Sequence, residues 1–152
     1  MHLSAYLTDP SVRPTVVTAA CALVDAEVQR ASGIPGMAVR SAYRVLMGIR
    51  PGIVPAAVDG LLDSFADQLD PFYQQHVTSG RPLVEILTEQ RTSMADALLS
   101  ITDDRAERTS QATLRRAYRR VRGSARGYVE EAAPGIAGLI DAYTPARTEP
   151  GA

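Results

Sequence analysis

Residues 53–70 read IVPAAVDGLLDSFADQLD, and they decide the fold because they divide into an apolar and an acidic face when wound as an α-helix. Four aspartates recur at helical spacing and fall within an arc of about 80°. They are Asp59, Asp63, Asp67 and Asp70. The side chains nearly opposite are apolar: Val54, Val58, Leu61, Leu62, Phe65 and Leu69. This pattern predicts an amphipathic helix over residues 53–69 that packs against other helices.

Helical spacing of apolar residues continues on both sides of this segment, with Pro or Gly at most of the interruptions. Asp9-Pro10 is typical of the start of a long first helix, and Asp70-Pro71 of the start of a separate short one. Ser93 and Ser110 stand where the N-caps of two later helices are expected. No stretch alternates apolar and polar residues as a strand does, so a β-sheet is not expected.

These elements predict an all-α fold, a single-domain bundle of about six or seven helices joined by short Pro/Gly turns. The domain is expected over residues 1–143, and residues 144–152 are expected to form a flexible C-terminal tail. A chain of 152 residues that is 45% hydrophobic can bury a core without disulfides. The single cysteine excludes an internal disulfide and a Cys-rich zinc site.

Composition also bears on where the protein works. All 16 basic residues are arginine, and since lysine codons are AT-rich, this indicates a GC-rich genome. A lone thiol fits a reducing compartment, so we expect a cytoplasmic protein. The longest apolar run, residues 16–24, is far shorter than the roughly 20 residues of a membrane-spanning helix. We therefore expect no transmembrane segment and no secretion signal.

The net charge of −1 conceals a separation of charge along the chain. Residues 59–104 hold nine acids and two arginines, whereas residues 105–126 hold eight arginines and one acid. Within the helix expected over residues 111–133, six arginines gather on one side: Arg115, Arg116, Arg119, Arg120, Arg122 and Arg126. The apolar side of that helix holds Leu114, Tyr118, Val121, Ala125 and Tyr128.

Three interpretations of the two charged stripes stay open at this stage. Both can be solvated surfaces, because like charges four residues apart destabilise a helix by only a few tenths of a kcal/mol per pair. The arginines can instead pair with the aspartates, within the chain or across a homodimer. The arginines can also bind phosphates of nucleic acid, anionic lipid or a nucleotide. Nucleic acid is the less expected partner, since the aromatic interleaving used for single strands is missing.

No catalytic centre and no metal or cofactor site stands out. Asp59 and Asp63 form an Asp-x-x-x-Asp pair of the kind that holds Mg²⁺ in isoprenoid synthases, but those enzymes bring a second acidic helix across the cavity. His2 and His76 have no partners at the spacing of zinc ligands. We therefore expect no catalytic residue, no metal and no cofactor.

An apolar cleft is a second candidate site, because aliphatic side chains dominate the expected helix interiors and can leave space between helices. We expect such a cleft between the apolar sides of helix 53–69 and helix 111–133. The candidate lining residues are Val58, Leu62, Phe65, Tyr118 and Val121. The connector over residues 50–55, RPGIVP, is a candidate lip of a pocket.

Three segments resemble a small family of uncharacterised actinobacterial all-helical proteins. They are residues 49–59 (IRPGIVPAAVD) with the following Leu61-Leu62, residues 69–72 (LDPF) and residues 95–99 (ADALL). The likeness spans most of residues 3–143. It implies a cytoplasmic helical domain in a GC-rich actinobacterium, and it supplies no catalytic or ligand residue.

The sequence thus predicts a non-catalytic helical protein that binds a partner protein or an apolar small molecule. One alternative is a regulator that binds anions or nucleic acid through the six arginines. Another is a small cofactor-free cyclase or isomerase acting in an apolar cleft, with Asp, Tyr or His as acid or base.

Overall fold

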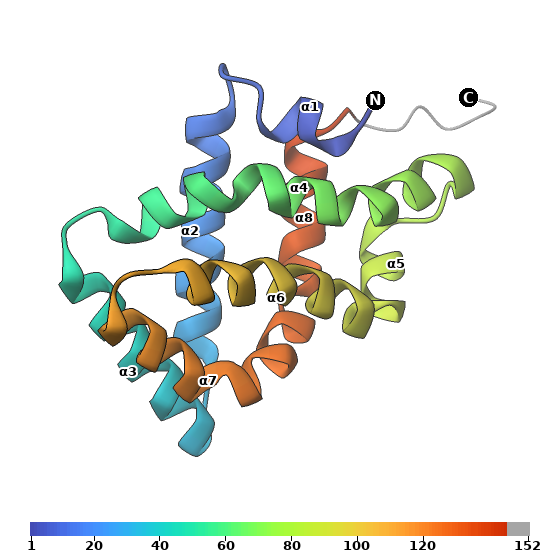
Figure 1. Ribbon diagram of the computed structural model, residues 1–152. Helices are drawn as coiled ribbons and strands as arrows, with labels where there is room; N and C mark the ends of the chain where they lie inside the picture. Colours follow the sequence, from blue (N-terminus) through green and yellow to red (C-terminus); the bar gives the residue numbers. More distant parts are fainter. Residues whose placement is uncertain (146–152) are drawn as a thin grey trace.

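The computed structural model describes residues 1–145, and every regular element in that range is an α-helix (Figure 1). The helices are α1 (Leu3–Leu7), α2 (Arg13–Arg30), α3 (Gly33–Ile49), α4 (Ile53–Ser79), α5 (Leu83–Glu89), α6 (Arg91–Arg108), α7 (Ala112–Glu131) and α8 (Ala133–Tyr143). The prediction of an all-α fold is confirmed. The count of six or seven is wrong, because the described residues form eight helices. Of the tail expected over residues 144–152, residues 146–152 lie outside the described range.

The acidic and apolar segment forms the first two-thirds of α4, which continues through Pro71 as one helix of 27 residues. The separate short helix expected from Asp70-Pro71 is therefore wrong. A proline inside a helix costs about 3 kcal/mol. Directly after it, however, Phe72 and Tyr73 are buried on the core side, at about 1.5–3 kcal/mol or more for each large side chain. Their burial outweighs the lost hydrogen bond, while the proline ring lies at the surface.

The N-terminal residues form a helix that the sequence did not predict. α1 has five residues, and it is held by the burial of Leu3 and Leu7 against the core. A long first helix beginning at Asp9-Pro10 is wrong, since α2 begins at Arg13. The Asp9 carboxylate accepts a hydrogen bond from Ser11 N at 2.8 Å and so closes a local turn instead of capping a helix.

The predicted serine caps are also wrong. α6 begins two residues before Ser93, and α7 begins two residues after Ser110. Neither helix has a side-chain hydrogen bond at its N-cap, where Gln90 and Gln111 stand. Both starts are fixed instead by the packing of the helices, which local cap preferences do not describe.

The helices form two crossed layers, and α3 and α7 form an additional pair at one end of the molecule (Figure 1). α4 and α6 lie side by side across the front, and α2 and α8 run behind them at a steep angle. α1 packs on α4 and α8, and α5 packs on α8 and α4. α3 and α7 pack on each other at the lower left, and α7 also packs on α6.

The buried core lies where α1, α2, α4, α5, α6 and α8 meet. Its members include Leu3, Leu7, Val16, Leu62, Leu69, Phe72, Leu83, Ile86, Leu87, Met94, Ala137 and Ile140. α3 contributes no side chain to this cluster, and from α7 the partly buried Val129 packs against it. The one buried residue of α3 is Gly36, and α7 has none. The α3–α7 end is thus attached to the body by partly buried contacts.

Candidate functional site

The six predicted arginines all lie on α7, but they divide into two groups. Arg122 and Arg126 point back to α6 and form ion pairs there. Arg122 donates from Nε to Asp103 Oδ1 at 2.7 Å and from Nη2 to Oδ2 at 3.1 Å. Arg126 donates from Nε to Asp96 Oδ1 at 2.8 Å. These two arginines therefore hold α7 against α6.

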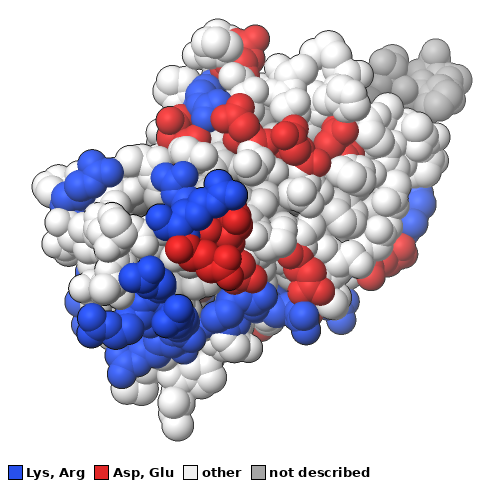
Figure 2. Space-filling view, in the orientation of Figure 1, with Lys and Arg blue, Asp and Glu red and all other residues white. Residues whose placement is uncertain are grey.

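The other four arginines make no ion pair with any acid among the described residues. Arg115 and Arg119 lie beside Asp103 and Glu107 around a small surface hollow. Arg116 and Arg120 are exposed on the α3 side of α7, where they share a hollow with Val45. We call these four residues of α7, Arg115, Arg116, Arg119 and Arg120, the basic face. Figure 2 shows blue side chains gathered over this end of the molecule.

On its α3 side, the basic face has surroundings that are poor in negative charge. No Asp or Glu occurs between Glu27 and Asp59, a stretch that includes all of α3. None occurs between Glu107 and Glu130, which covers α7 up to its last two residues. Since α3 packs directly on α7, these two stretches together make one end of the molecule positive.

In the aspartate stripe of α4 (Asp59, Asp63, Asp67 and Asp70), three of the four carboxylates have partners on the N-terminal part of the chain. Arg13 donates from Nε to Asp59 Oδ1 at 2.7 Å and from Nη2 to Asp63 Oδ2 at 2.9 Å. Asp70 accepts a hydrogen bond from Leu3 N at 2.7 Å. The hydrogen bond from Arg13 lowers the pKa of Asp63. The ion pairs of the described residues therefore do not join the aspartate stripe to the arginines of α7. Between these two helices lies α6, which packs against both α4 and α7.

A second feature is an open hollow of about 320 Å³ where α3, α4, α6 and α7 converge. Its wall is mainly apolar and includes Leu46, Ile53, Ala57, Leu61, Ala106 and Leu114. Arg50 and Ile53, from the connector singled out in the sequence, stand at this hollow. Among the five predicted cleft residues, Tyr118 is the one that lines it.

The other four predicted cleft residues are not brought together around this hollow. Leu62 belongs to the buried core, and Val58 packs against the core from α4. Phe65 and Val121 are partly buried on separate helices. The apolar side of α4 faces the body over most of its length, so only its first turns reach the space near α7.

Tyr118 lies in a polar cluster between α6 and α7. Its hydroxyl donates a hydrogen bond to Asp103 Oδ1, and the Thr102 hydroxyl lies 2.8 Å from the same phenol oxygen. Burial, together with the bond to Asp103, raises the pKa of Tyr118 to about 12. The hydrogen bond from Arg122 lowers the pKa of Asp103. At neutral pH the phenol is therefore a donor, and the cluster fixes the angle between the two helices.

Neither a metal-binding cluster nor a single membrane-spanning helix is found among the described residues. No three His, Cys, Asp or Glu side chains between residues 1 and 145 are grouped so that they could hold one metal ion. No single helix in this range is both long and apolar enough to cross a bilayer. α3 and α4 meet that criterion only jointly, as a pair bent by 101°.

The sequence reasoning missed the exposed aliphatic side chains of α3. Ile34 is 83% exposed, Met37 65%, Met47 48% and Val45 40%. Ile34, Met37 and Val45, spaced by three and then eight residues, follow one side of the helix, and Met47 lies on another side. The signal was present, because α3 is apolar on nearly all sides, and only part of such a helix can face a body that packs on one side of it.

We found no significant match to the chain among curated proteins or among solved structures. One family model, described as a family of unknown function (DUF6918), matches residues 3–144, which include all eight helices of the described structure. The chain belongs to the DUF6918 family.

Proposed function

We propose that the protein is a non-catalytic binding protein that docks on an anionic partner through the basic face of α7. The observation that carries this proposal is the position of Arg116 and Arg120. Both side chains are exposed, and the hollow that they share with Val45 and Thr113 contains no acid. A guanidinium group that has no intramolecular carboxylate keeps its donors for an external carboxylate or phosphate.

The arginines of α7 divide into those that form ion pairs with α6 and those of the basic face, and this difference supports the same proposal. Arg122 and Arg126 already supply the ion pairs that hold the helix on α6. The basic face adds like charges to the same helix without a matching gain in folding stability. A charged surface of this kind raises the rate and affinity of association with a partner of opposite charge.

The test is retention on immobilised heparin at about 50 mM salt, where contacts with polyanions are strong. We expect the wild-type protein to be retained despite its net charge of −1. The variant Arg116→Gln/Arg119→Gln/Arg120→Gln should pass through the column.

The matched control removes three arginines from other surfaces, as Arg81→Gln/Arg91→Gln/Arg108→Gln. It has the same net charge as the first variant and should be retained like the wild type. Passage of the wild-type protein, or equal loss of retention by both variants, would contradict the proposal.

Binding of a small apolar molecule is a second candidate function, favoured by the hollow between α3, α4, α6 and α7. Its volume of about 320 Å³ lies at the lower end of ordinary ligand pockets. Native mass spectrometry of protein purified without detergent should then show an added small-molecule mass. The added mass should disappear in Ala57→Phe, which places a ring in the hollow. An adduct that Ala57→Phe retains, or a wild-type protein without one, would remove this candidate.

We also propose a cytoplasmic location in a GC-rich actinobacterium. The proposal is supported by the single cysteine and by the use of arginine for all 16 basic residues. Immunogold labelling of the source cells tests the location, with labelling outside the cytoplasm and its membrane as the contrary result.

A further inference from the structure

We propose that the anionic partner is a phospholipid bilayer, on which α3 lies with its exposed aliphatic stripe against the lipid while the basic face contacts the phosphates. This inference rests on the proposed function and names the partner of the same surface. We define the aliphatic stripe as Ile34, Met37 and Val45 of α3.

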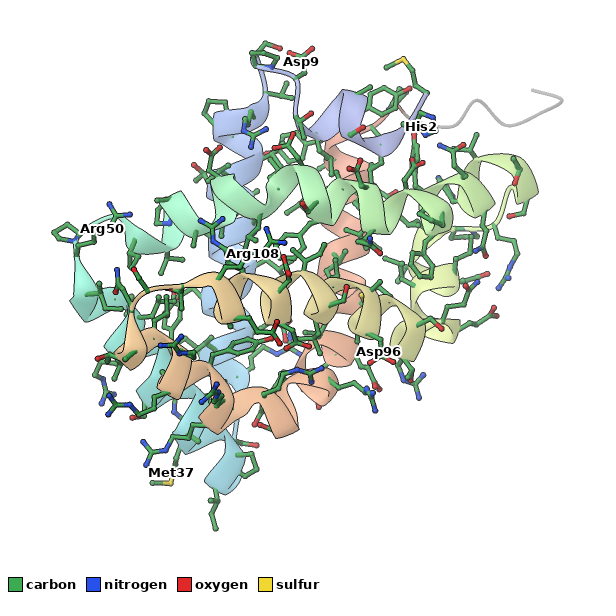
Figure 3. All side chains as sticks on the ribbon, in the orientation of Figure 1. His2, Asp9, Met37, Arg50, Asp96 and Arg108 are labelled. Atoms are coloured by element: carbon green, nitrogen blue, oxygen red, sulfur yellow. The ribbon has the colours of Figure 1, made fainter. Side chains whose placement is uncertain are left out.

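The aliphatic stripe begins at one extremity of the molecule. Ile34 and Met37 lie in the first turns of α3, and with Met1 they are the three most exposed large hydrophobic side chains of the described residues. Figure 3 shows Met37 pointing away from the body at the lower end of the molecule. In Figure 2, an uncharged tip projects beyond the blue side chains at the same end. Such side chains lose contact with water when they enter a bilayer interface.

The aliphatic stripe meets the Arg116 and Arg120 side of the basic face. Val45 at the far end of the stripe lines the same hollow as Arg116 and Arg120. Val45 lies eleven residue positions after Ile34, a distance of about 16 Å along the helix. A helix lying in the plane of the membrane can therefore bring the whole stripe to the lipid, with the arginines of α7 alongside at the level of the headgroups.

The charge around this surface fits the same orientation. α3 carries Arg40 and Arg44 and no acid, so no carboxylate of that helix would be pressed against lipid phosphates. The acids of α4 lie on another element and are engaged in part by Arg13. The molecule is thus polarised, and an anionic surface attracts the α3–α7 end while it repels the acidic side.

A bilayer explains both halves of this surface better than other anionic partners do. Nucleic acid offers phosphates to the arginines but leaves Ile34 and Met37 in water. An acidic protein would need apolar pockets placed to match both side chains. A bilayer needs no matched pocket, since the acyl chains rearrange around whatever apolar group enters the interface.

The first experiment is flotation with vesicles of phosphatidylcholine alone or mixed equally with phosphatidylglycerol. We expect binding to the mixed vesicles only, decreasing as salt is raised. The variant Ile34→Ser/Met37→Ser keeps all charges. It should bind the mixed vesicles about tenfold more weakly, or not at all, because it lacks the two large apolar side chains that leave water in the wild type. The substituted side chains are exposed, and circular dichroism verifies that the variant folds.

The matched control is Val77→Ser/Val84→Ser. It removes two exposed aliphatic side chains, 45% and 38% exposed, from α4 and α5 at the other end of the molecule. This variant should bind the mixed vesicles like the wild type. Equal weakening by both double variants would overturn the inference, and so would undiminished binding of Ile34→Ser/Met37→Ser.

The second experiment locates the side chain directly, because the chain contains no tryptophan. In Met37→Trp, the single indole should shift its emission to the blue on addition of mixed vesicles and be quenched by brominated lipid. In Val84→Trp, the emission should not change. An unshifted Met37→Trp spectrum on vesicles that bind the protein would overturn the insertion of α3.

These outcomes separate the inference from the proposed function. If heparin retains the protein but mixed vesicles do not, the basic face binds an anionic protein or nucleic acid, and the bilayer inference falls alone. If neither heparin nor mixed vesicles bind the protein, the proposed function falls as well.

Discussion

The body of the molecule and its α3–α7 end are held together by different means. In the body, side chains such as Leu3, Leu87 and Ile140 are at most 1% exposed. They come from opposite ends of the chain and from its middle. At the α3–α7 end, Leu114, Tyr118 and Val121 remain partly exposed. There the ion pairs of Arg122 and Arg126, with the phenol of Tyr118, supply much of what orients α7.

The stability of the fold depends little on the exposed surface of the α3–α7 end. Burial of apolar area is the main stabilising term in folding, and α3 and α7 contribute little to it. Regions with few buried contacts open at lower free energy than the core. Exposed aliphatic and arginine side chains are concentrated at the α3–α7 end, where the choice of residue affects the stability of the fold least.

The largest expected difference between the two regions follows from truncating one leucine in each. Leu87 is fully buried, so Leu87→Ala should lower the free energy of unfolding by about 2–5 kcal/mol. Leu114 of α7 is partly exposed, and Leu114→Ala should lower it by about 1 kcal/mol. Urea denaturation at pH 7 measures both values. Equal losses would mean that α7 is as well packed as the body.

The next largest loss of stability is expected at Gly36, where the backbone of α3 lies close to the backbone of Ala31 at the end of α2. A Cβ added to Gly36 would lie 2.6 Å from the carbonyl carbon of Ala31, which is backbone and has little room to move. Gly36→Ala should therefore destabilise the protein by about 1–3 kcal/mol. Gly48 of the same helix has no heavy atom near its added Cβ, so Gly48→Ala should be neutral or stabilise by up to about 1 kcal/mol. Thermal unfolding of the pair is the measurement, and the opposite order of stabilities would contradict the α2–α3 contact.

The fold class was predictable because burial imposes a period on the sequence. The two faces of α4 follow from the spacing of its aspartates and leucines, and packing did not alter them. α1 was missed because five residues are too few to show a period. The continuity of α4 was missed because a proline after an aspartate is typical of a helix start, and the burial of Phe72 and Tyr73 that overrides it depends on the tertiary structure.

The candidate site was predictable only in part. The six arginines were placed on one helix, and α7 contains all of them. Which of them form ion pairs depends on where Asp96 and Asp103 of α6 come to lie, and sequence spacing does not give the packing of α6 on α7. The aliphatic stripe of α3 was missed for a related reason. A helix that is apolar on most sides does not itself indicate which side its neighbours leave exposed.

A smaller effect is expected at Asp70, which ties the N-terminus to the body. Burial alone would raise the pKa of Asp70, but hydrogen bonds from Leu3 N, His2 and Gln74 together lower it. Because the folded pKa lies below the unfolded one, Asp70 stabilises the fold fully above the ordinary value of about 3.9. That contribution is lost as the pH falls through the lowered pKa.

Asp70→Asn should therefore lower the free energy of unfolding by about 1–2 kcal/mol at pH 7, and the gap to wild type should narrow at pH 3. Urea denaturation at both pH values measures this gap. Asp67 of the same helix is exposed, and Asp67→Asn should stay within about 0.5 kcal/mol of wild type. A gap that stays constant with pH would show that Asp70 acts through packing and not through its charge.

The smallest change in global stability is expected from a substitution at Asp103. This substitution nevertheless tests most directly whether the body and the α3–α7 end are held together by different means. Its side chain is 38% exposed, and Asp103→Asn should cost no more than about 1 kcal/mol of unfolding free energy. The same substitution weakens the ion pair to Arg122 and the bond from Tyr118, so α7 loses part of its attachment to α6. Hydrogen exchange should therefore become faster in the amides of α7 while those of α5 and α8 keep their rates. Uniform acceleration along the chain would mean instead that α7 opens only with the body, and the separation of the two regions would be wrong.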